Sequence, residues 1–422
     1  LHLSLRRQRQ MCIRDRGYIG LPTAVVMANS GLEVTGVDVN AANVEKINRG
    51  EVTIIEPGLE DELKKALDSG RFSASTEQVH ADAYIIAVPT PFTDGHAVDM
   101  KYIYSAAEAI APQLEGNELV VLESTSPPLT TQKMAQRILD LRPDLRADKE
   151  GTDPTEKTVY FAHCPERILP GKAMEELRTN DRIIGGQTSE ATRRASEVYA
   201  SFCEGELLPT NDVTAEMAKL TENSFRDVNI AFANELSLIA DNLDINVWEL
   251  IELANHHPRV NILQPGPGVG GHCIAVDPWF IVSSDPENSK LIGTARRIND
   301  DKPEWVIDKV VEAFEKSEGK ELAILGLAFK PDIDDLRESP ALEIAKRIST
   351  QFEDTQIDVV EPNIQSLPDS LSGFDNVELK PLEQAVDSAD VVLLLVDHRQ
   401  FKEFDAEKLK TKTVIDTKGL WQ

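Results

Sequence analysis

Short apolar runs alternate with amphipathic stretches along the first half of the chain. Four runs have the length and the Val/Ile/Leu-rich character of strands that are buried on both faces: 34–39, 83–89, 118–123 and 159–163. Strands of this kind, separated by helical patterns, are typical of parallel sheets with helices on both sides. The pattern therefore predicts an α/β fold for this part of the chain.

The pattern changes between residues 212 and 257, where apolar residues follow mixed three- and four-residue spacings. They are Ala218, Phe225, Ala231, Leu236, Ile239 and Leu243. This spacing predicts one long helix. Apolar residues on more than one face need more cover than one domain supplies, so we expect the helix to pack against a second copy of the chain, as a homodimer or a higher homo-oligomer.

A second strand-and-helix series follows, with strand-like runs at 322–325, 356–360, 391–396 and 414–416. A chain of 422 residues also exceeds what one hydrophobic core usually serves. We therefore expect an α/β domain over 17–205, a central helical segment over 206–317 and a second α/β domain over 318–422.

Residues 1–16 do not fit this scheme. The stretch LHLSLRRQRQMCIRDR is basic and has no sustained apolar run, whereas the following residues have the pattern of the turn and helix that come after a buried strand. The first strand is therefore predicted to be missing, and 1–16 to be a non-native segment outside the fold.

Composition excludes several classes of partner. Acidic residues outnumber basic ones by 72 to 44, and the net charge of −28 would repel nucleic acids and anionic membranes. The four cysteines show no paired spacing, which argues against a disulfide framework or a metal site. No apolar run reaches the roughly 18 residues of a membrane span, and no signal peptide is evident. We expect a cytosolic protein.

A dinucleotide site is indicated where the first helix pattern begins. Gly17-Tyr18-Ile19-Gly20 opens that pattern, and Asp38 follows eighteen residues after Gly20 at the end of a strand. In the dinucleotide fingerprint such glycines admit a pyrophosphate to the helix N-terminus and the acid binds ribose hydroxyls. A carboxylate would repel a 2′-phosphate, so NAD is expected. Asp15 replaces the fingerprint's first glycine, and an ordinary strand-to-helix turn is the alternative.

Two further runs end with small hydroxyl-bearing residues, in AVPTP and ESTSP. Ligands of open α/β sheets bind at the carboxyl ends of the strands, so Thr90 and Thr125 are candidate cofactor contacts. Turn capping is the alternative.

Cys273 lies in the glycine-rich segment QPGPGVGGHCIAVDP. A lone cysteine is more often a small buried hydrophobic residue than a nucleophile. The glycines before it, together with His272 and Asp277, favour a reactive thiol beside a ligand.

The motifs GYIGLP, AVPTP, ESTSP, CPER, AEMAKLTENSFRDVNIAFANE, HHPRVNILQPGPGVGGHCIAVDP and GLAFKPDIDDLRESP occur in order. From Gly17 onward the chain resembles the UDP-glucose/GDP-mannose dehydrogenase family. The resemblance implies an N-terminal Rossmann-like NAD domain, a central helical dimerisation segment with the catalytic cysteine, and a C-terminal Rossmann-like UDP-binding domain.

The resemblance also implies a reaction. The family oxidises a sugar CH2OH group to a carboxylate with two NAD, through a thiohemiacetal and a thioester on the cysteine. The matching residues here are Cys273, Lys219 in an acid/base and electrostatic role, Asn223, and Glu166 and Asp277 as acids that handle the hydrolytic water. Which acid is the base stays open.

Binding residues follow from the same resemblance. Cofactor contacts are expected from Tyr18, Ile19, Asp38, Thr90, Thr125, Thr131 and Arg337, although Leu129 stands where the family usually has glycine. Sugar-nucleotide contacts are expected from Arg167, Ile168, Lys219, Asn223, Arg226, His257, Arg259, Gly270, Phe329 and Lys330. The family's equivalent of Arg259 reaches the neighbouring subunit's site. For the charged residues, solvated surface ion pairs are the alternative.

The segments NSFRDVNIAF and GPGVGGHCIAVDPWF resemble the N-acetylhexosamine type of the family. UDP-N-acetyl-D-mannosamine is therefore the expected substrate. UDP-glucose or UDP-N-acetylglucosamine are the alternatives, and so is a nucleotide-sugar binder whose cofactor domain is impaired by the altered N-terminus.

Overall fold

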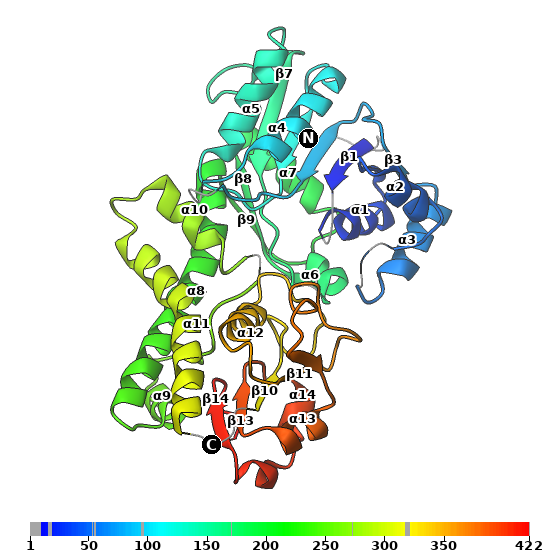
Figure 1. Cartoon of the computed structure of the whole chain (residues 1–422). Coiled ribbons are helices and arrows are strands. Elements are labelled where there is room, and N and C mark those ends of the chain that lie inside the picture. Colours follow the sequence, from blue (N-terminus) through cyan, green and yellow to red (C-terminus); the bar gives the residue numbers. More distant parts are fainter. Residues whose placement is uncertain are drawn as a thin grey trace. The chain divides into compact units, whose positions relative to one another are not determined.

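The computed structural model describes residues 10–15, 19–52, 54, 56–93, 97–169, 171–271, 273–316 and 321–421, with the backbone alone for 10–15. The chain forms two compact units, Leu1–Thr221 and Glu222–Gln422 (Figure 1). Each unit contains its own sheet.

The sheet of the first unit has the strand order β3-β2-β1-β4-β5-β7-β8-β9, with β6 paired to β7. The strands are β1 (Gln10–Asp15), β2 (Glu33–Val37), β3 (Phe72–Ser75), β4 (Ala83–Ala87), β5 (Leu119–Leu122), β6 (Arg146–Ala147), β7 (Thr158–His163), β8 (Arg182–Gly186) and β9 (Leu207–Asn211). Among these strands only β7 and β8 pair antiparallel. The predicted strand runs and the α/β class are confirmed.

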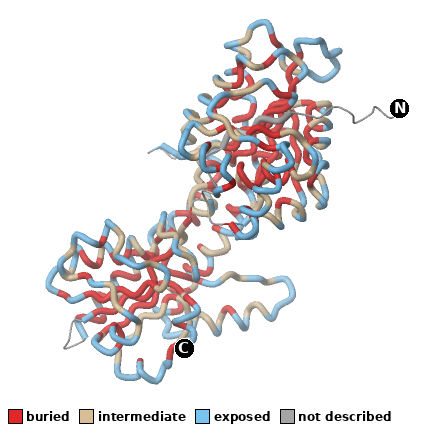
Figure 2. Tube along the Cα trace, turned by 90° about the vertical axis from the view of Figure 1, so that its right-hand side faces the viewer, coloured by how far each residue is buried: buried red, intermediate tan, exposed pale blue. Residues whose placement is uncertain are grey.

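Helices on both faces of this sheet explain why its strands are continuously apolar. The helices are α1 (Gly20–Asn29), α2 (Ala41–Asn48), α3 (Leu59–Asp68), α4 (Lys101–Ile110), α5 (Thr130–Leu141), α6 (Ala173–Thr179) and α7 (Ser189–Tyr199). In β5, Leu119 and Val121 join the core that contains α1, whereas Val120 and Leu122 join the core that contains α4. Successive side chains thus enter opposite cores, and β4, β5 and β7 are buried along their whole length, in the interior of the unit where buried residues gather (Figure 2).

The prediction that the first strand is missing is wrong. Residues 10–15 form β1, which pairs parallel with β2 on one side and with β4 on the other. Sheet pairing uses the backbone N–H and C=O groups that any sequence supplies, and without β1 both neighbouring strands would leave those groups unpaired. A foreign origin of residues 1–16 stays a hypothesis.

The long helical pattern forms two helices instead of the predicted one. These are α8 (Asp212–Asn242), within which the boundary between the units falls, and α9 (Val247–Asn255). Asp244 between them has a positive φ of 56°, which a right-handed helix does not accept. The Asn246 side chain then caps α9 by accepting from the amides of Trp248 and Glu249 at 2.9 and 3.1 Å.

The second unit contains a parallel sheet of order β12-β11-β10-β13-β14. Its strands are β10 (Leu322–Leu325), β11 (Ile357–Val360), β12 (Val377–Leu379), β13 (Val391–Leu394) and β14 (Thr413–Asp416), and its other helices are α10 (Asp277–Ser284), α11 (Lys290–Lys316), α12 (Pro340–Gln351), α13 (Leu382–Ser388) and α14 (Arg399–Lys402). Alternate strand residues again enter two cores. All four predicted strand runs are present.

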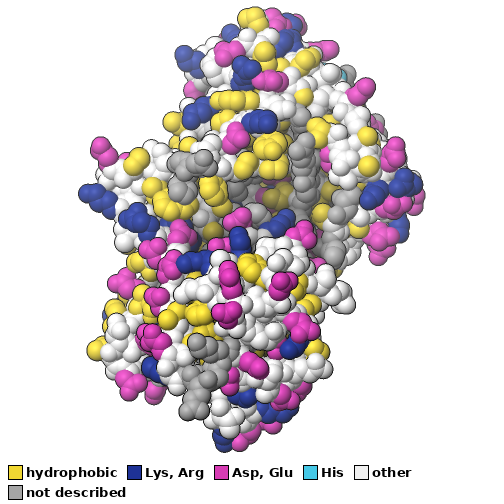
Figure 3. Space-filling model, in the orientation of Figure 1, with side chains coloured by type: hydrophobic (Ala, Val, Ile, Leu, Met, Phe, Trp, Pro, Cys, Tyr) yellow, Lys and Arg dark blue, Asp and Glu magenta, His cyan; other side chains and the backbone are white. Residues whose placement is uncertain are grey.

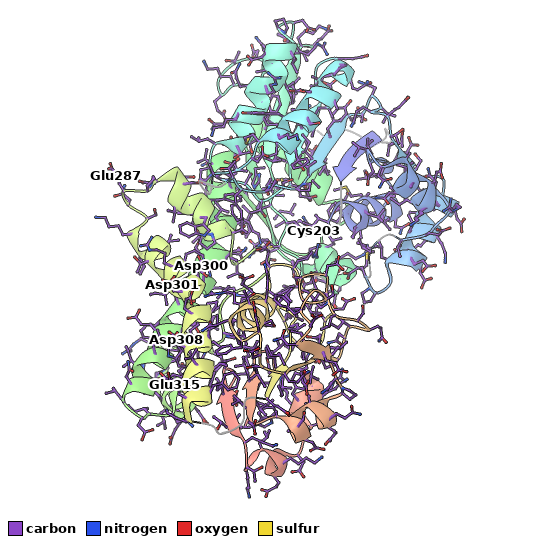
Figure 4. The ribbon with its side chains drawn as sticks, in the orientation of Figure 1. Cys203, Glu287, Asp300, Asp301, Asp308 and Glu315 are labelled. Atoms are coloured by element: carbon purple, nitrogen blue, oxygen red, sulfur yellow. The ribbon has the colours of Figure 1, made fainter. Side chains whose placement is uncertain are left out.

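Helix α11 is amphipathic. Val306, Val310 and Ala313 are buried, whereas Asp301 and Asp308 are exposed and lie along the helix with Glu315 (Figure 4). Within the described part of the chain, none of the helices combines the length and apolarity that crossing a bilayer requires.

Candidate active site

The carboxyl ends of the parallel strands in the first unit bring together two of the candidate cofactor residues. Thr90 follows β4 and Thr125 follows β5, and the Thr90 hydroxyl donates to the Thr125 carbonyl oxygen at 2.7 Å. Both residues are half-buried. Sequence spacing predicted their place at this edge, and the hydrogen bond joins the two loops there.

The start of α1 and the end of β2 have the features that a dinucleotide needs. Helix α1 begins at Gly20, and its N-cap residue Ile19 has no side-chain acceptor for the first amides of the helix. Asp38 directly follows β2, is half-buried, and accepts from the Asn40 amide at 2.8 Å through Oδ1. These residues suit a pyrophosphate and a ribose diol. Gly17 and Tyr18 lie outside the described residues.

Thr131 contacts an acid that sequence analysis did not single out. Its amide and its hydroxyl both donate to Oε1 of Glu216 at 2.7 Å. The Leu129 amide donates to Oε2 at 2.6 Å, and Leu129 itself has a positive φ of 74° where the family usually has glycine. Burial raises the pKa of Glu216 to about 7. The hydroxyl proton of Thr131 is thus already engaged by a carboxylate from α8.

Glu166 follows β7 and is buried beside the charged side chain of Arg182. Its Oε1 accepts from the Arg167 amide at 2.7 Å, and its Oε2 accepts from Arg182 at 3.0 Å. The Arg167 side chain donates to the Asp181 carbonyl oxygen at 3.1 Å, and Ile168 packs against the core of the unit. Both oxygens of Glu166 therefore accept hydrogen bonds, which fixes the orientation of the carboxyl group.

In the second unit, Cys273 lies in the turn that leads into α10. Its side chain is exposed, and its carbonyl oxygen accepts from the amides of Val276 and Asp277 at 3.2 and 2.9 Å. Asp277, the first residue of α10, is buried and accepts from the Asn223 side chain at 2.6 Å. Two candidate catalytic residues that are distant in sequence, Asn223 and Asp277, are thus brought into contact. His272 lies outside the described residues.

Lys219 and Asn223 lie one turn apart on α8, as predicted, and Lys219 is half-buried. One turn further along the same helix is Asp227, which forms an ion pair with Arg296 and accepts from Asn299 at 2.8 Å. Burial raises the pKa of Asp227 to about 6. The helix therefore carries a row of polar groups on a face that is largely buried.

Gly270 and Phe329, both candidate substrate contacts, also lie together. A Cβ built on Gly270 would come within 2.5 Å of the Glu338 carbonyl oxygen and 3.0 Å of the Phe329 Cβ. The loop therefore needs glycine there. Lys330 is exposed, and Arg337 forms an ion pair with Asp335 at 2.6 Å.

Three further candidates are exposed: Arg226, His257 and Arg259. Arg259 lines an apolar groove of about 490 Å³ with Phe225, Phe232 and Leu291. These three large apolar side chains are 69%, 52% and 69% exposed, which is unusual for their type.

Sequence reasoning missed three buried charged residues near the candidates: Glu216, Arg182 and Arg296. A signal existed for Glu216, because positions 216, 220, 223 and 227 follow the spacing of one helix face and three of them are polar. Polar residues on a buried face need partners, so this pattern indicates a polar network. Arg182 and Arg296 offered no comparable signal.

Comparison with known proteins adds to this geometry. Three consecutive segments match the UDP-glucose/GDP-mannose dehydrogenase family: its NAD binding domain over residues 9–203, its central domain over 213–301 and its UDP binding domain over 323–422. The chain belongs to this family. It therefore carries an NAD-binding and a UDP-binding domain, and is an NAD-dependent dehydrogenase of the family, as the sequence motifs predicted.

Individual relatives are similar over nearly the whole chain. UDP-N-acetyl-D-mannosamine dehydrogenase of Escherichia coli K12 is 54% identical over 414 residues, which cover 96% of this chain and 97% of the relative. NDP-N-acetyl-D-galactosaminuronic acid dehydrogenase of Ralstonia nicotianae is 52% identical over 413 residues, covering 98% and 96%. The solved structure of UDP-D-ManNAc dehydrogenase from Pyrococcus horikoshii has a TM-score of 0.85 and 38% identity, covering 98% of this chain and 96% of that one.

Proposed function

We propose that this enzyme oxidises UDP-N-acetyl-D-mannosamine to UDP-N-acetyl-D-mannosaminuronate with two NAD. The observation that carries the proposal is the 54% identity to a UDP-N-acetyl-D-mannosamine dehydrogenase over 96% of the chain. The exposed Cys273 beside the Asn223–Asp277 hydrogen bond supports the covalent part of the mechanism.

The electron count explains why a covalent intermediate is needed. A primary alcohol, water and two NAD⁺ give a carboxylate, two NADH and three protons, and each NAD accepts one hydride. The aldehyde must stay bound between the two transfers. Addition of the Cys273 thiol to the aldehyde carbon gives a thiohemiacetal, whose oxidation gives a thioester, and attack by water then breaks the C–S bond and releases the carboxylate and the thiol.

We assign the catalytic roles by residue type. Lys219 stabilises the developing alkoxide and takes part in proton transfer, because a cationic donor lowers the energy of an oxyanion. Asn223 orients the Asp277 carboxylate through their hydrogen bond of 2.6 Å. Glu166 and Asp277 are the two candidates for handling the hydrolytic water.

The binding residues are proposed on the same basis. Tyr18, Ile19, Asp38, Thr90, Thr125, Thr131 and Arg337 would hold NAD. The Thr131 hydroxyl already donates its proton to Glu216, so any contact of Thr131 with NAD would have to come from other atoms of this residue. Arg167, Ile168, Arg226, His257, Arg259, Gly270, Phe329 and Lys330, with Lys219 and Asn223, would hold the UDP-sugar. Arginine forks suit the pyrophosphate. The domain limits 17–205, 206–317 and 318–422 likewise remain a proposal.

A second candidate substrate has its own support. The N-acetylgalactosaminuronic acid dehydrogenase is 52% identical, almost as similar as the mannosamine enzyme. Overall similarity therefore separates these N-acetylhexosamines poorly. UDP-N-acetylgalactosamine belongs in the substrate panel beside UDP-glucose and UDP-N-acetylglucosamine.

The central test counts NADH. With UDP-N-acetyl-D-mannosamine, the wild-type chain should produce two NADH per sugar and the uronate. Cys273→Ala should lose uronate formation, because no thiol retains the aldehyde, whereas Cys203→Ala should keep it, since Cys203 is a half-buried thiol of the first unit. One NADH per sugar with release of free aldehyde would refute the thioester mechanism. UDP-sugar binding without NAD binding would favour the alternative that the chain binds a nucleotide sugar but has an impaired cofactor domain.

We also propose that the enzyme is a homodimer. The apolar groove that contains Phe225, Phe232 and Leu291 is the surface that a second copy would cover. If Arg259 in this groove contacts the partner's substrate, the dimer is needed for activity. Sedimentation velocity tests this, and a monomer at micromolar concentration would exclude it.

A further inference from the structure

Three strands of the second unit end together at one edge of its sheet. Strand β10 lies between β11 and β13, and all the strand pairs of this sheet are parallel (Figure 1). The chain continues from β10 to one side through β11 and β12, and then crosses to the other side through β13 and β14. Open α/β sheets bind ligands at the carboxyl ends of the strands where this reversal occurs. The loop 326–332 follows β10 at that point and contains Phe329 and Lys330.

A buried acid that follows β11 holds the first part of this loop. Glu361 directly follows β11, and its side chain is fully buried. Its Oε2 accepts from the amides of Leu327 and Ala328 at 2.7 and 3.0 Å. Its Oε1 accepts from the Asn363 amide at 3.2 Å. One carboxylate oxygen therefore fixes the two residues that precede Phe329.

A buried histidine that follows β13 holds the last part of the loop. His398 lies four residues after β13 and is fully buried. Its Nδ1 accepts from the Asp332 amide at 2.9 Å, and its Nε2 lies 3.1 Å from Oε2 of Glu361. Because a backbone amide only donates, Nδ1 carries no hydrogen, and the single hydrogen of the neutral ring is donated from Nε2 to Glu361. One imidazole ring thereby joins the segments that follow all three strands.

Asp332 has a backbone conformation that needs support of this kind. Its φ of 61° lies in the left-handed region, which is unfavourable for residues other than glycine and is tolerated by aspartate when hydrogen bonds hold it. The Asp332 amide donates to His398, and its Oδ1 accepts from the Arg399 amide at 3.0 Å. Lys330 is exposed and lies two residues before Asp332. The position of Lys330 therefore depends on the bonds that hold Asp332.

Stability alone does not explain a histidine and a glutamate at this depth. Removing charged and polar groups from water costs free energy, and well-packed apolar side chains of similar volume are often at least as stabilising. Apolar side chains, however, accept no hydrogen bonds from the amides of Leu327, Ala328 and Asp332. A structural role and a positioning role thus predict different effects of substitution at these two buried positions.

We propose that His398, together with Glu361, is a positioning residue for UDP binding, which holds the loop 326–332 in the arrangement that presents Phe329 and Lys330 to the nucleotide. The inference rests on the proposed substrate contacts of Phe329 and Lys330. Both positioning side chains are fully buried, so they act on the nucleotide through the loop and not by direct contact.

Binding of UDP to the full chain tests the proposal, with binding of NAD as the internal reference. In His398→Phe the ring contact with Phe401, at 5.3 Å between centroids, is kept but both nitrogens are lost. The dissociation constant of UDP should rise about tenfold, because the loop would occupy its binding arrangement only a fraction of the time. The dissociation constant of NAD should not change, since NAD binds to a different domain. Calorimetric titration measures both constants.

His398→Asn is the rescue variant. The asparagine Oδ1 takes the place of Nδ1 and accepts from the Asp332 amide, so UDP affinity should stay within about threefold of the wild type. A purely structural role predicts no rescue, because asparagine fills less of the buried space than phenylalanine. In turnover, KM for the UDP-sugar should follow the order of the UDP dissociation constants, while KM for NAD stays at the wild-type value. Equal losses of UDP affinity in His398→Asn and His398→Phe would contradict the proposal.

Lys380→Met is the matched control. Lys380 forms an ion pair of 2.9 Å with the buried Asp358, which lies in β11 three residues before Glu361. The substitution also removes a partner from a buried acid, so it should lower stability but leave the dissociation constant of UDP unchanged. If that constant rose as much as in His398→Phe, general destabilisation would account for the loss, and the inference would be overturned.

Glu361→Gln covers the case in which His398→Phe does not fold. Glutamine has one side-chain oxygen where glutamate has two, so it cannot accept from both the loop amides and the Asn363 amide, and UDP affinity should again fall about tenfold. Wild-type UDP affinity in a folded His398→Phe or Glu361→Gln protein would overturn the inference, and so would a wild-type chain that does not bind UDP. A wild-type chain that binds UDP but makes no NADH with any UDP-sugar would instead refute the proposed function.

Discussion

At the scale of single residues, Gly270 shows how close packing limits a loop. Its backbone lies against Phe329, Glu338 and Pro340, and a Cβ would come within 2.5 Å of both the Glu338 carbonyl oxygen and the Pro340 Cδ. These neighbours are backbone and ring atoms, which move little. The loop before Cys273 therefore depends on the absence of a side chain at this position.

We predict that Gly270→Ala will weaken UDP binding and destabilise the protein by about 1–3 kcal/mol, because overpacking forces backbone shifts of this cost. Calorimetric titration with UDP and thermal unfolding measure the two effects. Gly373→Ala is the control, since nothing lies within 4 Å of the added Cβ there. Equal stability of the two variants would show that the loop adjusts freely.

At the scale of elements, the glycine-rich segment is held by α8 through side chains. Asn229 accepts from the Leu263 amide at 2.9 Å, and Asn234 accepts from the Gly266 amide at 2.9 Å. Asn234 also donates to Asn299 of α11 at 2.8 Å. These side-chain hydrogen bonds take the place of the backbone hydrogen bonds that a strand or helix would make.

Asn234→Ala should lower the free energy of unfolding by about 2 kcal/mol. The substitution removes the partners of the buried Gly266 amide and of the side-chain oxygen Oδ1 of Asn299. Chemical denaturation measures this. Asn288→Ala should change stability by less than about 0.5 kcal/mol, as Asn288 is exposed and bonds only locally to Asp285. A similar loss in both variants would contradict a specific role for Asn234.

At the scale of the whole molecule, the net charge of −28 coexists with a few buried cations. Figure 3 shows acidic and basic side chains interspersed over the visible surface. Unlike these surface side chains, Lys302 is buried. It donates to the Ser237 hydroxyl at 2.6 Å and lies 3.6 Å from the centroid of the Trp305 ring. Burial lowers its pKa from 10.5 to about 7.

This pKa predicts a pH dependence of stability. Between about pH 7 and 10.5 the unfolded chain binds a proton at Lys302 that the folded chain releases. Stability from this group therefore rises with pH, by at most about 1.4 kcal/mol per pH unit. Relative to Lys302→Met, the wild type should gain stability from pH 7 to 9.5 in urea unfolding.

Lys408→Met is the control for this experiment. A hydrogen bond to Glu383 raises the pKa of Lys408, so this exposed lysine stays protonated in both states below about pH 9.5. Its stability difference from the wild type should not change with pH in that window. If the stability difference between the wild type and Lys302→Met also stayed constant with pH, the lowered pKa of Lys302 would be refuted.

Local sequence determined much of this protein. Apolar runs predicted the strands, because a strand covered on both faces must be apolar at every position. Chain order placed Thr90 and Thr125 at one edge, because parallel strands end on the same side of a sheet. Motifs gave the family and NAD, and Lys219 and Asn223 were predicted neighbours from the helical repeat alone.

Tertiary structure decided what depends on contacts between distant segments. The sequence suggested no first strand, yet residues 10–15 pair between β2 and β4, since their backbone can complete the sheet whatever side chains they carry. The partners of Glu216 and Arg182 and the Asp227 partner of Arg296 come from other elements, and the contact of Asn223 with Asp277 spans 54 positions. Such pairs have no sequence period, because their geometry comes from strand register and helix packing instead of from local spacing.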